Sequence, residues 1–199
     1  MNTFSHYILT ALILSAGTAL ADPIIGVTAT SATTVCCGTS LSDIVNGRGL
    51  TSYTTAGIHD DRADAILTSR TGNIDFDLHG TYWVNSIAAW NAAFGVKEFS
   101  LLYSTDGATF TPVSTGPYLL SLISLPTNST AEVFNFAPVQ ATHMRMAMLS
   151  GYSSGDSTSL KEVMFVSTAA PPPSTLPEGG GSVALLSTAV LLAWRRVQR

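Results

Sequence analysis

An alternation of apolar and polar residues with a period of two most constrains how this chain folds. Residues 74–78 alternate apolar and acidic side chains, as a strand does when one face is buried and the other meets water. Met144, Met146 and Met148 repeat this spacing later. No stretch of residues 22–168 carries a 3.6-residue apolar stripe with helix caps. The pattern predicts an all-β domain over residues 22–168.

About eight strands are expected, separated by turns that contain Gly, Asn or Asp. The clearest turn signal is Thr105-Asp106-Gly107, which joins two expected strands as a hairpin. The expected strands cover residues 74–78, 83–90, 96–104, 109–111, 118–125, 132–136, 142–148 and 160–166. Strands at this spacing favour a β-sandwich or a barrel, and we expect an antiparallel β-sandwich or jelly roll. Residues 22–73 give a weaker pattern and are expected to be rich in loops.

The middle of the chain resembles a discoidin-type domain, also called galactose-binding-like or coagulation-factor type C. The most specific part is the run Tyr-Ser-Thr-Asp-Gly-Ala-Thr-Phe at residues 103–110. The resemblance covers most of residues 40–167; near the last strands, Thr142 and His143 replace the family's usual Arg and Tyr, while Arg145 is kept. It implies a discoidin-like sandwich that binds a ligand, such as a glycan, without catalysing a reaction.

The same resemblance implies one structural calcium ion, held between an early Asn-Gly loop and a glutamate near the last strand. The matching positions are Asn46 and Glu162, together with Asp43. Calcium takes six to eight oxygen ligands, many of them backbone carbonyls, so few side chains need to be present. The alternative is that Glu162 accepts backbone hydrogen bonds and Asn46 makes a turn.

Four residues are candidates for contact with a sugar. Tyr53, Tyr118 and Tyr152 lie in expected loops, where an aromatic ring can stack on a sugar ring. Arg62 belongs to the polar cluster at residues 59–64. That cluster suits a cation site or sugar hydroxyls, but also a solvated loop whose ion pairs contribute little. Other aromatic residues are expected in the core, namely Trp90, Tyr103 and Phe110.

Charge and motifs argue against two classes of function. Residues 22–176 contain six Lys and Arg against twelve Asp and Glu, a net charge of −6. Such a surface repels phosphate backbones, so we expect no nucleic-acid partner. The sequence contains neither Gly-x-Ser-x-Gly nor His-Glu-x-x-His, and no glycine-rich phosphate loop follows an expected strand. We therefore expect no enzyme activity, and a hydrolase is the less favoured alternative.

The two cysteines are neighbours, Cys36 and Cys37. An exported protein can form disulfides, but a bond between adjacent cysteines closes a strained ring. Reduced thiols, a vicinal or intermolecular disulfide, and metal binding all stay open, although metal sites normally need more widely spaced cysteines and further ligands.

The N-terminus predicts export. Residues 8–20 are an apolar run that ends at Ala19-Leu20-Ala21, a cleavage site of the signal-peptide type. We expect residues 1–21 to be a signal peptide, with the mature chain starting at Asp22.

The C-terminus predicts membrane sorting. Residues 169–181 form a Pro- and Gly-rich linker, and residues 182–199 an apolar helix followed by basic residues. This end resembles a PEP-CTERM signal, the tag read by an exosortase, with Gly in place of the motif's second Pro. The residues that carry the resemblance are Leu176, Pro177, Glu178, Gly179, Arg195 and Arg196. The alternative is a plain membrane anchor, for which the apolar run is short.

These features together predict an exported, surface-sorted binding module for glycans or an extracellular polysaccharide matrix. The alternative is a passive matrix protein without a small ligand. The expected partners are an exosortase-type enzyme, a glycan, and the membrane before processing. The expected location is the inner membrane transiently, then the cell surface or extracellular matrix of a Gram-negative-type bacterium.

Overall fold

The computed structural model of the 199-residue chain describes residues 22–60, 65–123 and 128–170. The expected signal peptide, sorting motif and two flanking apolar helices lie outside the described residues. Within the described part, no helix is long and apolar enough to span a membrane.

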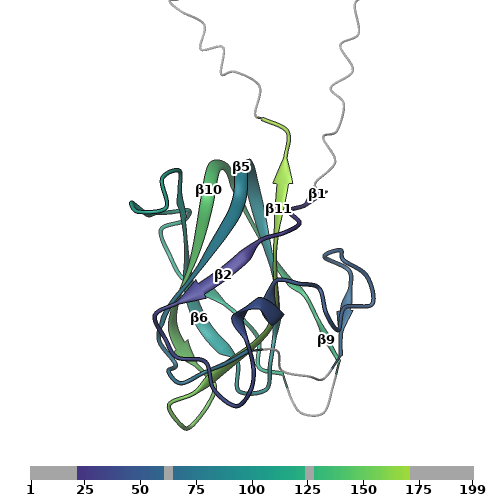
Figure 1. Cartoon of the computed structure of the whole chain (residues 1–199), viewed down its shortest axis with the longest axis vertical. Helices are drawn as coiled ribbons and strands as arrows, with labels where there is room; N and C mark the ends of the chain where they lie inside the picture. The colour runs from purple at the N-terminus through teal and green to yellow at the C-terminus, as the bar shows by residue number, and fades with distance from the viewer. Residues whose placement is uncertain (1–21, 61–64, 124–127, 171–199) are drawn as a thin grey trace, which may run out of the picture. The chain divides into compact units, whose positions relative to one another are not determined.

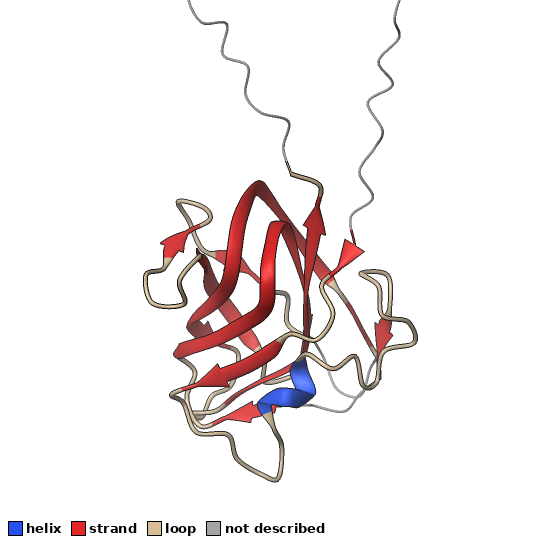
Figure 2. Ribbon diagram, turned by 45° about the horizontal axis from the view of Figure 1, so that its top comes forward, coloured by secondary structure: helices blue, strands red, loops and turns tan. Residues whose placement is uncertain are grey.

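The described residues form strands joined by loops, with one short 3-10 turn (Figures 1 and 2). The elements are β1 (Asp22–Pro23), β2 (Thr28–Ser31), η1 (Leu41–Ile44), β3 (Ile58–His59), β4 (Ala65–Leu67), β5 (Gly72–Asn91), β6 (Val96–Ser104), β7 (Thr111–Pro112), β8 (Tyr118–Leu119), β9 (Ser129–Thr130), β10 (Glu132–Gly151) and β11 (Thr158–Thr168). The expected all-β class is confirmed, and the region before β5 is indeed mostly loop.

Two long antiparallel strands, β5 and β10, run through both layers of a sandwich. The first half of β5 pairs with β2 and the second half of β10, which in turn pairs with β6. The second half of β5 pairs with β11 and the first half of β10. We call these the front and back layers. Both strands bend over at the top of the view in Figure 1.

The sequence predicts two strands where each of these long strands lies, because bulges interrupt its pattern. Residues 78–81 of β5 lie opposite the single residue Thr142 of β10, and residues 136–138 of β10 lie opposite Asn85. Extra residues on one strand bend and twist it locally. The alternation therefore breaks at each bend although the strand continues.

The core lies between the two layers. Phe76 of the front layer and Phe165 of the back layer meet edge to face, with ring centroids 5.0 Å apart, and both are fully buried. The expected methionine face is confirmed, because Met144, Met146 and Met148 all belong to this core. Alternating burial along β5 and β10 thus gives the front layer one apolar and one polar face.

The outer face of the back layer is covered by the loop at residues 47–57. Trp90 is fully buried there beside Met164, and its indole N–H donates to the carbonyl of Gly57 at 2.8 Å. The expected burial of Trp90 is confirmed. β11 is consequently buried on both faces over most of its length.

The expectation that Phe110 is a core residue is wrong. Its side chain is only partly buried, and the guanidinium carbon of Arg145 lies 3.8 Å from the centre of its ring. Phe110 follows the turn at Asp106-Gly107 and stays on the outer, polar face of the front layer. Tyr103 packs against the core as expected. Tyr118, expected in a loop as a sugar contact, also packs against the core, stacked on Phe99 with ring centroids 5.3 Å apart.

Cys36 and Cys37 are joined to each other by a disulfide. Cys37 has a φ of 64°, in the left-handed region that few non-glycine residues adopt. Of the alternatives that the sequence leaves open, the structure has the vicinal disulfide.

Phe76 offers a test of how the layers hold together. We expect Phe76→Ala to lower the free energy of unfolding by about 3–5 kcal/mol, because a fully buried ring leaves a cavity. Phe94→Ala is the matched control, because Phe94 is 57% exposed, and should change stability by no more than about 0.5 kcal/mol. Urea unfolding measures both; equal effects would contradict this account of the core.

Candidate functional site

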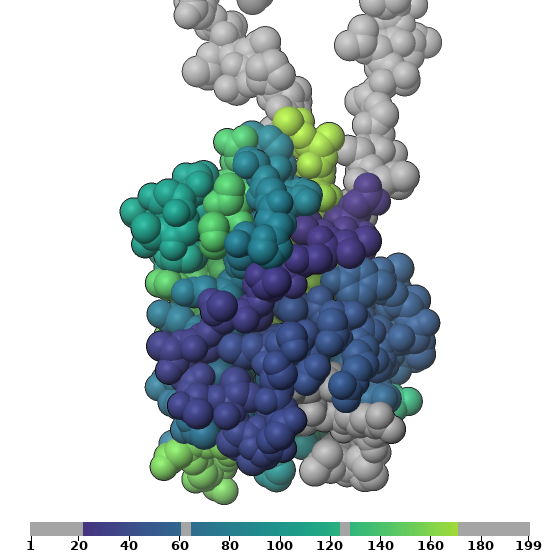
Figure 3. All heavy atoms as spheres, in the orientation of Figure 1, coloured from purple at the N-terminus to yellow at the C-terminus, as the bar shows by residue number. Residues whose placement is uncertain are grey.

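One cleft of the described residues lies at the edge of the sandwich, beside β2. Its volume is about 630 Å³, within the range of small-molecule sites. Its lining residues are Ile25, Gly26, Val27, Thr28, Ala29, Ser42, Val45, Asn46, Gly47 and Tyr53. In Figure 3 the segment around β2 (purple) crosses the front of the molecule, and the loop of residues 45–60 (blue) lies beside it. None of these lining residues is charged, so the cleft suits a neutral ligand.

Tyr53 forms one wall of this cleft and is held by packing. Its ring lies against the small cluster of Ala88, Trp90 and Met164 on the outer face of the back layer. Burial, and secondly the negative charge of Glu162, raise the pKa of the Tyr53 hydroxyl above its ordinary value. The hydroxyl therefore stays protonated at neutral pH.

Gly47 is required beside this ring. Its φ is 71°, and a Cβ at this position would collide with the Tyr53 ring. The Asn46-Gly47 turn thus lets the loop approach Tyr53 closely and fixes the position of the ring.

Glu162 of β11 anchors the same turn from the inside of the protein. Its Oε1 accepts a hydrogen bond from the backbone N–H of Gly47 at 3.1 Å, and its side chain is fully buried. Asn46 Oδ1 accepts the N–H of Arg48 at 2.8 Å. These hydrogen bonds fit the alternative to calcium binding, in which Glu162 accepts backbone hydrogen bonds and Asn46 makes a turn.

The three residues expected to bind calcium therefore lie around one turn. Asp43 Oδ1 lies 3.4 Å from the amide nitrogen of Asn46 and 3.8 Å from a guanidinium nitrogen of Arg48. Carboxylate and amide oxygens are the donors that calcium prefers, but each of these oxygens already faces an N–H group. Among the described residues, no three His, Cys, Asp or Glu side chains gather as a metal site. Calcium stays a prediction.

Two residues of the polar cluster at residues 59–64, His59 and Asp60, belong to the part of the chain that the structure describes. His59 is fully buried, with Nδ1 3.0 Å from the carbonyl oxygen of Asp60. Lys161, also buried, donates to that same carbonyl at 2.7 Å. The hydrogen bond from Lys161 attaches Asp60 to β11. Arg62 lies outside the described residues.

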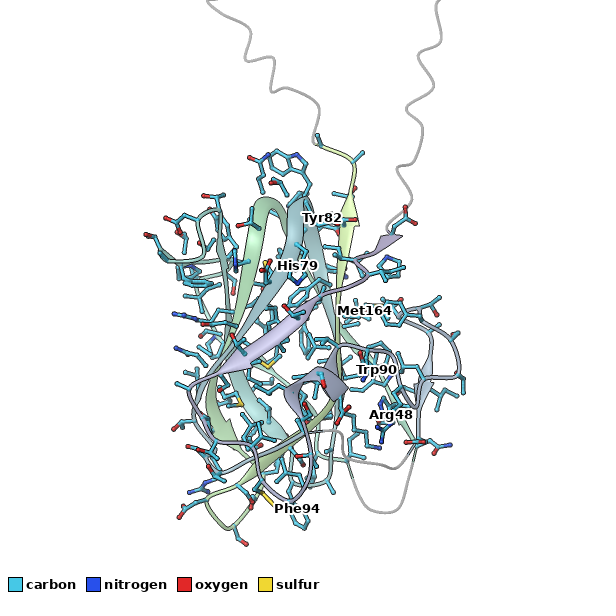
Figure 4. All side chains as sticks on the ribbon, in the orientation of Figure 1. Arg48, His79, Tyr82, Trp90, Phe94 and Met164 are labelled. Carbon is cyan, nitrogen blue, oxygen red and sulfur yellow. A yellow bond between two sulfur atoms is a disulfide. The ribbon has the colours of Figure 1, made fainter. Side chains whose placement is uncertain are left out.

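Tyr152 and Tyr53 do not share a cleft. The hydroxyl of Tyr152 donates to the carbonyl of Leu120 at 2.7 Å, and its backbone N–H donates to Gly95. Tyr152 is absent from the described lining of the Tyr53 cleft. It belongs instead to the loops near Phe94, an exposed aromatic residue that projects at the bottom of Figure 4.

Phe94 is an exposed aromatic residue that the sequence pattern does not single out. It lies between β5 and β6, two residues after the last buried apolar residue of the strand region, Ala92, and directly before Gly95. Its place directly before a glycine, between two strands, is the sequence signal that could have predicted an exposed side chain.

The comparison with solved structures shows the fold. A carbohydrate-binding module of family 32 from NanJ of Clostridium perfringens, in complex with galactose, superposes with a TM-score of 0.54 at 14% identity, covering 74% of this chain and 99% of that one. The module CpGH89CBM32-5 of the same organism, in complex with GalNAc-β-1,3-galactose, gives 0.53 at 17% identity, with 72% and 99% covered. The fold is discoidin-like.

A third module supports the same conclusion. CBM32-3 from a family 31 glycoside hydrolase of Clostridium perfringens has a TM-score of 0.53 at 18% identity, and 71% of this chain and 91% of that chain are covered. No protein-family model matches the sequence, and no curated protein matches it. At these identities the likeness establishes the β-sandwich fold that the sequence predicted.

Proposed function

We propose that this protein is a non-catalytic carbohydrate-binding module and that the Tyr53 cleft holds a sugar ring. The observation that carries the proposal is a neutral cleft with a fixed aromatic wall and a polar rim from Thr28, Ser42 and Asn46. The fold shared with carbohydrate-binding modules supports it.

The chemistry of the cleft suits a sugar better than a charged ligand. A sugar ring has apolar C–H faces, which pack on an aromatic ring, and a rim of hydroxyls, which need hydrogen-bond partners. Tyr53 and Val45 offer the apolar contact, and Thr28, Ser42 and Asn46 offer hydroxyl and amide groups. Because packing holds the Tyr53 ring before the ligand arrives, little side-chain entropy is lost on binding.

Binding to galactose and to GalNAc-β-1,3-galactose tests the proposal. We expect Tyr53→Ala to weaken binding of the better ligand by about tenfold, the loss of about 1.4 kcal/mol of contact energy, and Tyr53→Phe to weaken it less, because stacking is kept. Isothermal titration calorimetry measures both.

Tyr152→Ala is the matched comparison, because it removes a tyrosine that lies outside the cleft. Loss of binding in Tyr152→Ala but not in Tyr53→Ala would move the site to the loops near Phe94. A glycan array without any signal, combined with self-association, would favour a passive matrix protein instead.

The family resemblance also leads us to propose one structural calcium ion at the Asn46-Gly47 turn, with Asp43, Asn46, Glu162 and backbone carbonyls as ligands. A metal that binds only the folded state raises its stability. We therefore expect a higher melting temperature in calcium than in chelator, and no such difference in Glu162→Gln. Equal melting temperatures of the unaltered protein would show that the hydrogen bonds of Asn46 and Glu162 suffice.

We further propose export through residues 1–21 and sorting through the tail, in which Leu176, Pro177, Glu178 and Gly179 form the processing motif ahead of Arg195 and Arg196. Mass spectrometry of the native surface protein should then find a chain that ends near Pro177. A surface form that still ends at Arg199 would contradict sorting by cleavage and favour a permanent anchor.

A further inference from the structure

The outer face of the front layer carries two rows of polar side chains in register. Thr28 of β2 pairs with Asp77 of β5, which pairs with His143 of β10. One row further, Thr30 pairs with Asp75, which pairs with Arg145. Because side chains two residues apart on a strand point to the same face, all six side chains lie on the same face of the sheet. Phe76 and Met144, between them, point into the core.

A second cleft, of about 290 Å³, lies over these rows. Its lining residues are Thr28, Thr30, Asp75, Asp77, Gly107, Phe110 and His143. The volume is at the lower end of the range of small-molecule sites, so the cleft suits one small ring. We call it the Asp77 cleft.

The wall of the Asp77 cleft is built by the loop after β6. Asp106 accepts hydrogen bonds from the N–H groups of Thr109 and Ala108 at 2.8 and 2.9 Å, which hold the pKa of its carboxyl far below the ordinary value. Gly107, with a φ of 73°, lies so close to His143 that a Cβ would come within 3.0 Å of its ring. Residues 103–110, the most specific part of the resemblance to discoidin-type domains, therefore shape this cleft.

Phe110 closes the same wall as a fixed aromatic group. Arg145 stacks on its ring and also holds Asp75 by two hydrogen bonds, of 2.5 and 2.8 Å. The carboxylate of Asp75 is thereby paired with the guanidinium of Arg145, and Phe110 is held at the cleft by a cation–π contact. This arrangement explains why Phe110 is not in the core.

Asp77 and His143 place two hydrogen-bond acceptors side by side. Thr142 Oγ1 uses its single proton toward the carbonyl of Ser104, so it accepts from Nδ1 of His143 at 2.9 Å. The tautomer of His143 that has its proton on Nδ1 presents Nε2 as an acceptor. Nε2 lies 3.8 Å from Asp77 Oδ1, which is too far for a direct hydrogen bond. Neighbouring hydroxyls of a sugar are donors that fit such a pair.

Asp77 is turned toward the cleft by the bulge in β5. His79, at the bulge, has a φ of 52°; its N–H donates to Asp77 Oδ1 at 2.8 Å, and its Nε2 lies 3.0 Å from Thr28 Oγ1. Bulges commonly redirect side chains next to binding sites. Figure 4 shows His79 directly above β2.

The Asp77 cleft adjoins the Tyr53 cleft, because Thr28 of β2 lines both. We propose that the two clefts are subsites of one binding surface and that the ligand is a neutral oligosaccharide or polysaccharide chain that crosses β2. Tyr53 binds one sugar ring, and the pair of Asp77 and His143 binds the hydroxyls of another beside Phe110. This inference rests on the proposed function and deepens it from a single sugar to a chain.

Chain length and two variants test this inference. The probes are galactose and a linear β-1,4-galactotetraose, titrated calorimetrically into the full chain. We expect the tetrasaccharide to bind about tenfold or more tighter than galactose. Asp77→Asn, nearly equal in size, should remove most of that gain and leave galactose affinity within about twofold. Asp156→Asn, the same change in the exposed loop before β11, should leave both affinities unchanged.

A second readout does not depend on the variant. Addition of the tetrasaccharide should shift the ring NMR signals of His143 in the unaltered protein, whereas galactose should shift them little. Unchanged His143 signals with bound tetrasaccharide, or a tetrasaccharide affinity that Asp77→Asn does not alter, would overturn the second subsite. Loss of galactose binding in Tyr53→Ala would still support the proposed function in that case, whereas a protein that binds neither probe would contradict both.

Discussion

The pairing of β5 with β10 is the constraint on which the rest of the structure depends. Both strands pass through the front and the back layer, so the layers are joined by hydrogen bonds and by continuous chain. Bulges at residues 78–81 and 136–138 allow the bend. Bending brings Phe76 against Phe165 and closes the core. Without this pairing the two layers would have no fixed distance or angle, and neither cleft would have a defined shape.

The two faces of the sandwich that point outward have different roles because different segments cover them. On the back layer, Trp90 and Met164 are apolar and bind the loop at residues 47–57, which brings Tyr53 to the edge of the sandwich. On the front layer the outward residues are polar and stay accessible beside the loop with Phe110. β2 lies between these regions and contributes Thr28 to both clefts. The proposed binding surface is thus a consequence of how the edges of the sandwich are covered.

Much of the fold and less of the site could be predicted from the sequence. Alternation in residues 74–78 and in the methionine run identified strands and their buried faces, because local periodicity reports burial directly. It did not reveal that β5 and β10 are continuous, because bulges break the period. The sequence placed Asn46 and Glu162 at one site only through a family resemblance. The sequence also grouped Tyr53 with Tyr152 as sugar contacts. In the structure the Tyr152 hydroxyl donates to the carbonyl of Leu120, outside the Tyr53 cleft.

By itself, the sequence determined an all-β sandwich, an acidic body and turns such as Asp106-Gly107, because these follow from side-chain periodicity, charge and local backbone preference. Only the tertiary structure decided that Thr28, Asp77 and His143 form one row and that Phe110 lies at a cleft rather than in the core. The register between strands distant in sequence sets such neighbours, and shifting it by one residue would place them on the opposite face. Local patterns specify which face of a strand is polar, but the pairing of strands specifies which polar groups act together.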